Sequence, residues 1–330
     1  MSIHSVDRRA AILAGLSCLT LGIPTASLAA GFPERPIRLL VGFPPSGGAD
    51  IVARLVAQRL GEALGGNVVV ENKPGANGTI AAADAARSPG DGYTLLLGVP
   101  ASQSISPALM PKLPFDAAKD FTPISVIGST PLVLVVNPKL PAKNVQEFIA
   151  LVKSSKEPIP YGSAGIGNIT HMAAELFIQT TGAKNLHHIP YKGSSQVITD
   201  LIGGQIQAYF DTLPSSLPFI QNGQLRALAV TSTSRVGVAP DVPTMLEAGV
   251  KDYSPTNWFG VLAPRGLDKA LVTQIHSALV AGFRDAEARS SLTAKGVEPV
   301  FNDPGQFRAE LATDQERWRT VTRKAGIVLE

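Results

Sequence analysis

The stretch from Pro36 to Leu55 constrains the fold more than any other part of this chain. It reads PIRLLVGFPPSGGADIVARL. A short apolar run, typical of a buried strand, is broken by prolines and glycines, and apolar residues then recur at helical spacing from Asp50 onward. This order predicts a strand, a tight glycine turn and a helix that starts at the turn.

A helix that starts at a glycine turn gathers unpaired backbone N–H groups around one point. The helix dipole adds partial positive charge there, and glycines let a ligand approach the main chain closely. Ser46 can cap the helix or donate its hydroxyl to a ligand. The alternative is an ordinary βα loop, in which the glycines serve only the turn. A Walker A nucleotide site is not predicted, because no Gly-Lys-Ser/Thr sequence follows.

Composition narrows the class of protein. The chain has 330 residues, enough for two medium domains with full cores. Its formal net charge is +3 with lysines and arginines scattered, so neither a nucleic-acid partner nor a membrane surface is predicted.

Residues 1–29 are predicted to be a secretory signal peptide. Arg8-Arg9 provides the positive region, Ala10 to Ile23 the apolar region, and Ser27-Leu28-Ala29 the small-residue cleavage site. We therefore expect an exported protein whose mature chain begins near Ala30. Whether export uses the general or the twin-arginine route stays open.

The single cysteine of the sequence, Cys18, falls inside this leader. Its lead-in, Gly15-Leu16-Ser17, is a weak lipidation signal, so we expect an unlipidated protein. The mature chain would then hold no disulfide and no thiolate metal site.

Strands alternate with helices along the rest of the chain, which predicts a parallel α/β sheet. Residues 105–130 are proline-rich and are expected to be irregular, and a second α/β series then begins at the strand Leu132–Val136. A further strand is expected at Asn257–Ala263, before a helical tail. The predicted strands of the first series end in loops of small or polar residues, which gather at the ligand-binding edge of such a sheet. These loops read PPSGGAD, NKPGANGT and GVPAS.

A second glycine loop, from Gly162 to His171, repeats the order of strand, small residues and helix N-terminus. Gly165-x-Gly167 matches part of a dinucleotide fingerprint, but Thr170 stands at its third glycine position and no acidic residue ends the following strand. A nicotinamide or flavin site is therefore not predicted, and no cofactor is expected.

These segments, taken together, resemble the tripartite tricarboxylate transporter substrate-receptor family, also called Bug receptors, of bacterial periplasmic solute-binding proteins. The resemblance covers essentially the whole mature chain. It is carried, in family order, by PERPIRLLVGFPPSGGADIVARL, VVVENKPGANGTIAAA, SPGDGYTLLLG, LPFDAAKDFTPIS, LVLVVNP, YGSAGIGNITHMAAELF, IPYKGSSQVITDLIGGQIQAYFD, LRALAVTS, DVPTMLEAG and WFGVLAP.

The resemblance implies an α/β fold of the type II periplasmic-binding class, with two α/β domains joined by two crossing strands around a ligand cleft. Domain 1 would comprise 30–129 plus 253–330, and domain 2 would comprise 130–252. It also implies a monomer in the periplasm that binds a small organic anion, usually a carboxylate, and delivers it to a two-subunit membrane permease. Catalysis, a metal and a cofactor are not implied.

The two glycine loops would hold the anion. Two helix N-termini facing a cleft supply uncharged donors that favour an anion, and neither loop contains an arginine. Ser46 and Ala49 replace a glycine and a threonine common in the family, and Asn168 replaces a serine or threonine, so we expect the ligand contacts to differ from the common pattern. The contacts carried over from the family are Phe43, Ser46, Gly47, Gly48, Ala49, Ala101, Ser102, Ser163, Ala164, Gly165, Gly167, Asn168 and Asp211.

Three other features have competing interpretations. His171 and Glu175, spaced i, i+4, are expected to form a helical hydrogen bond or cap rather than a metal or acid–base pair. Asp211 can accept a bond from a ligand or cap the next segment. Trp258-Phe259 is expected to pack in the core or hinge.

Two other function classes remain possible at this point. An exported hydrolase is disfavoured, because the sequence has no Gly-x-Ser-x-Gly elbow, no HExxH helix and no cysteine after the leader. A ligand-dependent sensor that signals to a membrane kinase would have the same sequence features as a receptor. The sequence does not name the anion: citrate, smaller dicarboxylates, aromatic acids and acidic amino acids all suit the two loops.

Overall fold

The structure, a computed structural model, describes residues 31–110 and 112–325. The predicted signal peptide, Cys18 and the cleavage site before Ala30 lie outside the described residues. The chain from Pro33 onward belongs to one unit, which carries all the elements described below.

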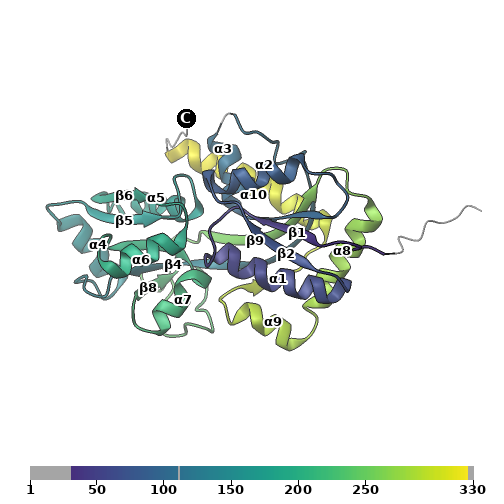
Figure 1. The fold of residues 1–330 in the computed structure, drawn as a ribbon. Helices are drawn as coiled ribbons and strands as arrows, with labels where there is room; N and C mark the ends of the chain where they lie inside the picture. Colours follow the sequence, from purple (N-terminus) through teal and green to yellow (C-terminus); the bar gives the residue numbers. More distant parts are fainter. Residues whose placement is uncertain (1–30, 111, 326–330) are drawn as a thin grey trace, which may run out of the picture. The chain divides into compact units, whose positions relative to one another are not determined.

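One long strand, β4 (Phe121–Val136), connects two sheets (Figure 1). Its part up to Pro131 pairs antiparallel with β9 (Thr256–Pro264), and its last five residues pair with strands of the second sheet. The first sheet holds β1 (Ile37–Val41), β2 (Val68–Asn72), β3 (Thr94–Gly98), β9 and the short β10 (Glu298–Pro299). The second sheet holds β5 (Ile159–Ser163), β6 (Leu186–Pro190), β7 (Ala208–Thr212) and β8 (Arg226–Val230).

Each sheet contains the predicted parallel strands: β1 lies between β2 and β3, and β5 lies between β6 and β7. The helices of the first series are α1 (Gly48–Leu64) and α2 (Thr79–Arg87), with the short η1 (Ala76–Gly78), η2 (Ala101–Ile105) and α3 (Ser106–Leu109). Those of the second are α4 (Val145–Ser154), α5 (Ile169–Thr181), α6 (Ser194–Gly203) and α7 (Leu213–Gln221). The tail forms α8 (Lys269–Gly282), α9 (Ala286–Thr293) and α10 (Pro304–Ala325). No helix within the described ranges is long and apolar enough to cross a membrane.

The expectation that 105–130 is irregular was wrong, because β4 already starts at Phe121. Pro123 lies inside this strand, and the pairing with β9 shifts register between Pro123 and Ser125 and again between Val126 and Gly128. Proline removes a ladder donor and so argues against a strand in the sequence, but a β-bulge accommodates it.

The strands are apolar because helices cover them. Leu39, Leu40 and Val41 of β1 are fully buried, as is every residue from Leu132 to Val136. Trp258 packs edge-on against Phe307 of α10 and donates from Nε1 to Asp314 at 3.0 Å, which agrees with the expected packing role.

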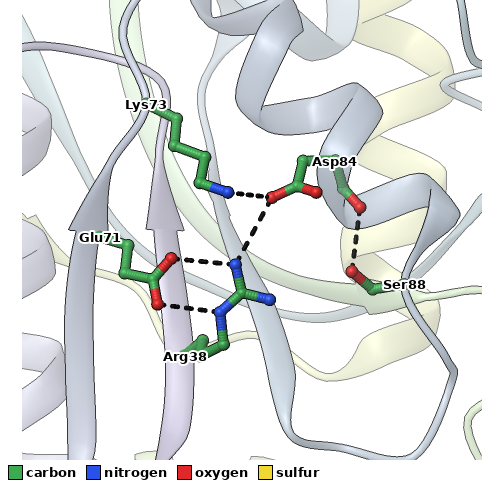
Figure 2. Close-up of polar contacts among 5 residues, drawn as sticks. All are labelled: Arg38, Glu71, Lys73, Asp84 and Ser88. Atoms are coloured by element: carbon green, nitrogen blue, oxygen red, sulfur yellow. Dashed lines mark hydrogen bonds and ion pairs between the residues drawn. The ribbon is translucent and has the colours of Figure 1, made fainter.

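Four charged residues tie the edge of the first sheet to α2 (Figure 2). The Arg38 guanidinium donates twice to the Glu71 carboxylate, at 2.9 Å each, and lies 3.5 Å from Asp84. Lys73 donates to the same Asp84 at 2.6 Å. The network joins the two ends of the loop after β2, because Glu71 lies in β2, Lys73 is the first residue after it, and Asp84 lies in α2.

We predict that Glu71→Gln lowers the free energy of unfolding by about 0.5–1 kcal/mol at pH 7, since both partners are about one third exposed and are screened by water. The hydrogen bond from Arg38 lowers the pKa of Glu71 below 4.5. The stabilisation is therefore present above pH 4.5 and is lost as the pH falls through the lowered pKa. Denaturant titrations of the wild type and Glu71→Gln at pH 7 and pH 3.5 measure the difference in their free energies of unfolding. The exposed Glu157→Gln serves as the control, and an unchanged difference at both pH values would contradict the prediction.

Candidate functional site

The first glycine loop is fixed by the carboxylate of Asp50. It accepts from the Ser46 N–H at 2.9 Å, from Arg54 at 2.9 and 3.0 Å, and from Asn72 at 2.9 Å. Burial raises the pKa of Asp50, but the bonds from Arg54, Ser46 and Asn72 outweigh it, so the pKa lies below its usual value. Ser46 is exposed with a φ of +66°, and the α1 N-cap is Gly47 without a side-chain cap. The predicted cap by the Ser46 hydroxyl is thus not formed.

The second glycine loop saturates many of its own donors. Ala164 N donates to Thr170 Oγ1 at 2.9 Å, and Gly167 N donates to His171 Nδ1 at 3.1 Å. The side chain of Asn168 caps α5, because its Oδ1 accepts from Thr170 N. The loop is therefore rigid without a ligand.

The two sides of the site touch each other directly. Gly48 N, in the first turn of α1, donates to Ser215 Oγ of α7 at 3.0 Å. Asn77 Nδ2, from the loop after β2, donates to the Ile166 carbonyl of the second glycine loop. A Cβ at Gly48 would lie only 2.6 Å from Thr212 Oγ1, so this close approach requires glycine.

A small cavity lies where the two sides meet, with a volume of about 40 Å³ open to the centres of water molecules. It is lined by Phe43, Pro44, Gly47, Gly48, Ala49, Val99, Ala101, Ala164, Asn168, Ile169, Thr170, Ser194, Thr212, Asn257 and Phe259. Its polar side chains are amides and hydroxyls, and no charged side chain is among these fifteen.

Four helices point their N-termini at this cavity. Gly48 begins α1, Ile169 begins α5, Ser194 begins α6, and Thr212 is the N-cap of α7. First-turn N–H groups have no acceptor within their own helix, and each helix dipole adds partial positive charge at this end. The cavity is therefore suited to an anion, although no cationic side chain lines it.

Seven of the thirteen residues expected at the site line the cavity: Phe43, Gly47, Gly48, Ala49, Ala101, Ala164 and Asn168. The other six lie around it. Ser46 is exposed, and the Ser102 hydroxyl is turned to the Val99 carbonyl at 3.4 Å. Ser163 is buried and hydrogen-bonded to His188, Gly165 lines a neighbouring hollow with Asn77 and Tyr191, and the Gly167 N–H is taken by His171. Asp211 is described below.

Eight lining residues were missed: Pro44, Val99, Ile169, Thr170, Ser194, Thr212, Asn257 and Phe259. Ser194 and Thr212 could have been found, because each opens a helix after a strand of the second series. Asn257 and Phe259 could not, since nothing in the sequence of β9 tells which of its faces meets the cavity.

Asp211 lies beneath the cavity wall with no exposed surface. Its Oδ1 accepts from Ser194 Oγ at 2.9 Å and from Thr212 N at 2.8 Å, and its Oδ2 accepts from Ser216 Oγ at 2.7 Å. Asp211 does not cap α7, because Thr212 holds the N-cap position and this helix has no side-chain cap; Asp211 instead binds Thr212 N and the Ser216 hydroxyl at its start. Asp211 also orients two lining residues, Ser194 and Thr212. Burial raises its pKa to about 6, against the opposing effect of these donors.

A stack of aromatic rings supports the second glycine loop. The His188 ring lies between His171, at 4.1 Å, and Tyr161, at 5.0 Å, measured between ring centroids. Glu175 Oε1 accepts from Tyr161 at 2.9 Å and lies 3.6 Å from His171 Nε2, in the expected i, i+4 relation. Burial lowers the pKa of His171 to about 3 and that of His188 to about 4, so both rings are uncharged at neutral pH. Among the described residues, no three His, Cys, Asp or Glu side chains are grouped so that they could hold a metal ion.

Residues 52–327 match the model of a protein family described as the tripartite tricarboxylate transporter family receptor. The chain belongs to this family. Its members are binding receptors, and the mixed α/β fold is that of periplasmic binding proteins of this type.

Several members of the receptor family are similar over nearly their whole length. Protein BugT of Bordetella pertussis is 37% identical over 317 residues, covering 96% of this chain and 97% of BugT. The solved periplasmic binding protein BugD is 34% identical with a TM-score of 0.86, covering 90% of this chain and 100% of BugD. Rpa4515 of R. palustris, solved with adipate, is 34% identical with a TM-score of 0.87, covering 90% of this chain and 99% of Rpa4515. MatC of Rhodopseudomonas palustris, solved with malate, is 29% identical with a TM-score of 0.82, covering 88% and 99%.

We predict that Asp211→Asn removes a loss of folding stability that the wild type shows as the pH rises from about 4 to about 6. Because burial raises the pKa of Asp211 from 3.8 to about 6, the folded state keeps a proton that the unfolded state has lost between these values. Wild-type stability therefore gains an unfavourable contribution as the pH rises from about 4 to about 6, reaching about 3 kcal/mol at 1.36 kcal/mol per pH unit.

Urea titrations of both proteins at pH 4 and pH 6.5 measure this contribution. The stability of the wild type relative to Asp211→Asn should fall over that range. A difference that stays constant would show that Asp211 has an ordinary pKa.

Proposed function

We propose that this chain is a periplasmic receptor that captures a small organic anion, a carboxylate, and delivers it to a two-subunit membrane permease of the tripartite tricarboxylate type. One observation carries the proposal: four helix N-termini converge on a cavity whose lining has no charged side chain. In such a site, oriented N–H groups rather than an ion pair compensate the anion for the hydration that it loses.

The main-chain amides of Ala49 and Ile169 are the central donors in this proposal. Both residues line the cavity and lie in the first turns of α1 and α5, on opposite sides. Asn168 adds a side-chain donor, because its Oδ1 already accepts from Thr170 and its Nδ2 remains for the ligand. Rpa4515 and MatC, which are similar over most of this chain, carry adipate and malate, and both ligands are carboxylates.

We further propose that the protein is exported by the leader 1–29, acts as a monomer in the periplasm, and closes by a hinge. Domain 1 would be 30–129 plus 253–330, and domain 2 would be 130–252. The hinge proposal rests on the path of the chain, which passes from the first sheet to the second within β4 and returns before β9. Two connections of this kind permit rigid-body closure over a ligand.

The hydrolase alternative has one structural feature in its favour. Ser163 Oγ lies 2.6 Å from His188 Nε2, as in a nucleophile–base pair. However, Ser163 has no exposed surface and does not line the cavity, and its hydroxyl also bonds the Gly165 main chain. We therefore assign Ser163 to the support of the second glycine loop.

We predict that Gly48→Asp abolishes binding while the protein still folds. The new carboxylate would stand beside the anion, and two unit charges about 4 Å apart repel by roughly 4 kcal/mol at an effective dielectric near 20, close to a thousandfold in affinity. Its Cβ would also meet Thr212 Oγ1 across the cavity and hinder closure.

A thermal-shift screen of organic acids identifies a ligand for wild type, and calorimetry then compares the variant. Gly203→Asp is the matched control, because a Cβ there meets nothing within 4 Å and Gly203 ends α6 far along the helix from its cavity end. Wild-type affinity in a folded Gly48→Asp protein would remove the first loop from the binding site.

We predict that Asn77→Gly speeds ligand release. The variant loses the bond from Asn77 to the Ile166 carbonyl, which joins the two sides of the site, and glycine tolerates the φ of +57° found there. Loss of about 1 kcal/mol from the closed state should raise the dissociation rate about fivefold and leave the association rate unchanged. Stopped-flow fluorescence measures both rates. Ala76→Gly, which relieves a φ of +45° without touching Ile166, is the control. A slower association with normal release would argue against this closing role.

A further inference from the structure

One side chain in the cavity has no hydrogen-bond partner among the residues that the structure describes. Asn257, on β9, lines the cavity and is only 3% exposed. Its main chain pairs with Thr130 of β4, which fixes the side chain on the same face of β9 as Phe259, another lining residue. The carboxamide of Asn257 is thus enclosed on the cavity face of β9 and is free to bind.

Each of the other polar side chains of the cavity already makes at least one hydrogen bond, although the Nδ2 group of Asn168 is unpaired. Thr170 Oγ1 donates to Asn168 Oδ1 and accepts from Ala164 N. Ser194 Oγ donates to Asp211, and Thr212 Oγ1 is paired with Ser215 Oγ at 3.0 Å. Asn257 is therefore the lining side chain in which neither the donor nor the acceptor is engaged by a described residue.

The hydrogen bonding of a buried carboxamide is satisfied only when its NH₂ group donates and its oxygen accepts. A carboxylate can satisfy the NH₂ group but has no proton for the oxygen. A hydroxyl satisfies both, because it donates and accepts. A buried polar group left unpaired is costly, so this end of the cavity selects for a ligand group that carries a proton.

A second carboxylate would also lack compensation here. No cation lines the cavity, and its walls include the apolar side chains of Phe43, Val99 and Phe259. Behind Ser194 lies Asp211, an acidic group. A second carboxylate placed against Asn257 would meet these apolar walls and would leave the Asn257 oxygen without a hydrogen-bond donor.

We propose that Asn257 determines ligand specificity, and that the ligand is a small monocarboxylate bearing an uncharged hydroxyl rather than a dicarboxylate. This inference rests on the proposed function. The helix N-termini hold the carboxylate, and the Asn257 carboxamide exchanges two hydrogen bonds with the hydroxyl.

Calorimetry on the wild-type protein with five acids tests the ligand class: butanoate, its 2-, 3- and 4-hydroxy derivatives, and succinate. At least one hydroxy acid should bind about tenfold or more tightly than butanoate, the effect expected of a paired hydroxyl, and more tightly than succinate. Succinate as the tightest ligand, or butanoate binding as well as every hydroxy derivative, would overturn the inference.

Asn257→Leu tests the residue, because leucine has a similar shape and no polar atom. The preference for the hydroxy acid over butanoate should fall from about tenfold to about onefold, while butanoate binding is kept. Thr256→Val is the matched control, since Thr256 precedes Asn257 on β9 but is exposed and lines no part of this cavity. A hydroxyl preference that persists in Asn257→Leu would overturn the role of Asn257. If Asn257→Leu does not fold, Asn257→Ser and the wild-type series still decide the question.

The two proposals fail in different ways. Tight succinate binding that Gly48→Asp abolishes would keep the receptor function and overturn the hydroxy-acid inference. Binding of none of the acids, in the series or in a wider screen of organic acids, would overturn the proposed function, and the inference that rests on it.

Discussion

The site depends on one strand that carries two sheets. β4 pairs with β9 of the first sheet over its first part and with β7 and β8 of the second sheet over its last residues. Each sheet has parallel strands whose carboxyl ends open into helix N-termini. Because one strand joins the sheets, these ends face a shared cavity, and donors 120 residues apart in sequence can bind one anion.

The charged side chains near the first glycine loop pair with one another, and none of them lines the cavity. Arg54, four residues after Asp50 in α1, is bound to Asp50, and Arg38 and Lys73 are bound to Glu71 and Asp84. Buried Asp211 is satisfied by hydroxyls and one amide. What reaches the ligand is therefore a set of uncharged dipoles, which can bind an anion and release it again more readily than a buried ion pair would.

Different residues join the two sides of the site and, in our proposal, select the ligand. Gly48 and Asn77 form hydrogen bonds to the opposite side of the cavity. Asn257 makes no such contact and presents its carboxamide only to the cavity. If Asn257 selects the ligand as we propose, ligand preference can change in β9 without altering the glycine loops; the similar proteins Rpa4515 and MatC were solved with different acids, adipate and malate.

The sequence alone determined the strand–glycine–helix units, because turn residues and apolar periodicity are local signals. The family resemblance added seven lining residues, six in the two glycine loops and Ala101 in the predicted loop after β3. It missed the early start of β4, since prolines there argue against a strand until a partner strand accommodates them in bulges. Only the tertiary structure decided that Asp211 lies under the wall, that His188 stacks on His171, and that Asn257 lines the cavity. Each of these depends on which face of a strand meets a distant element, and no local pattern encodes that.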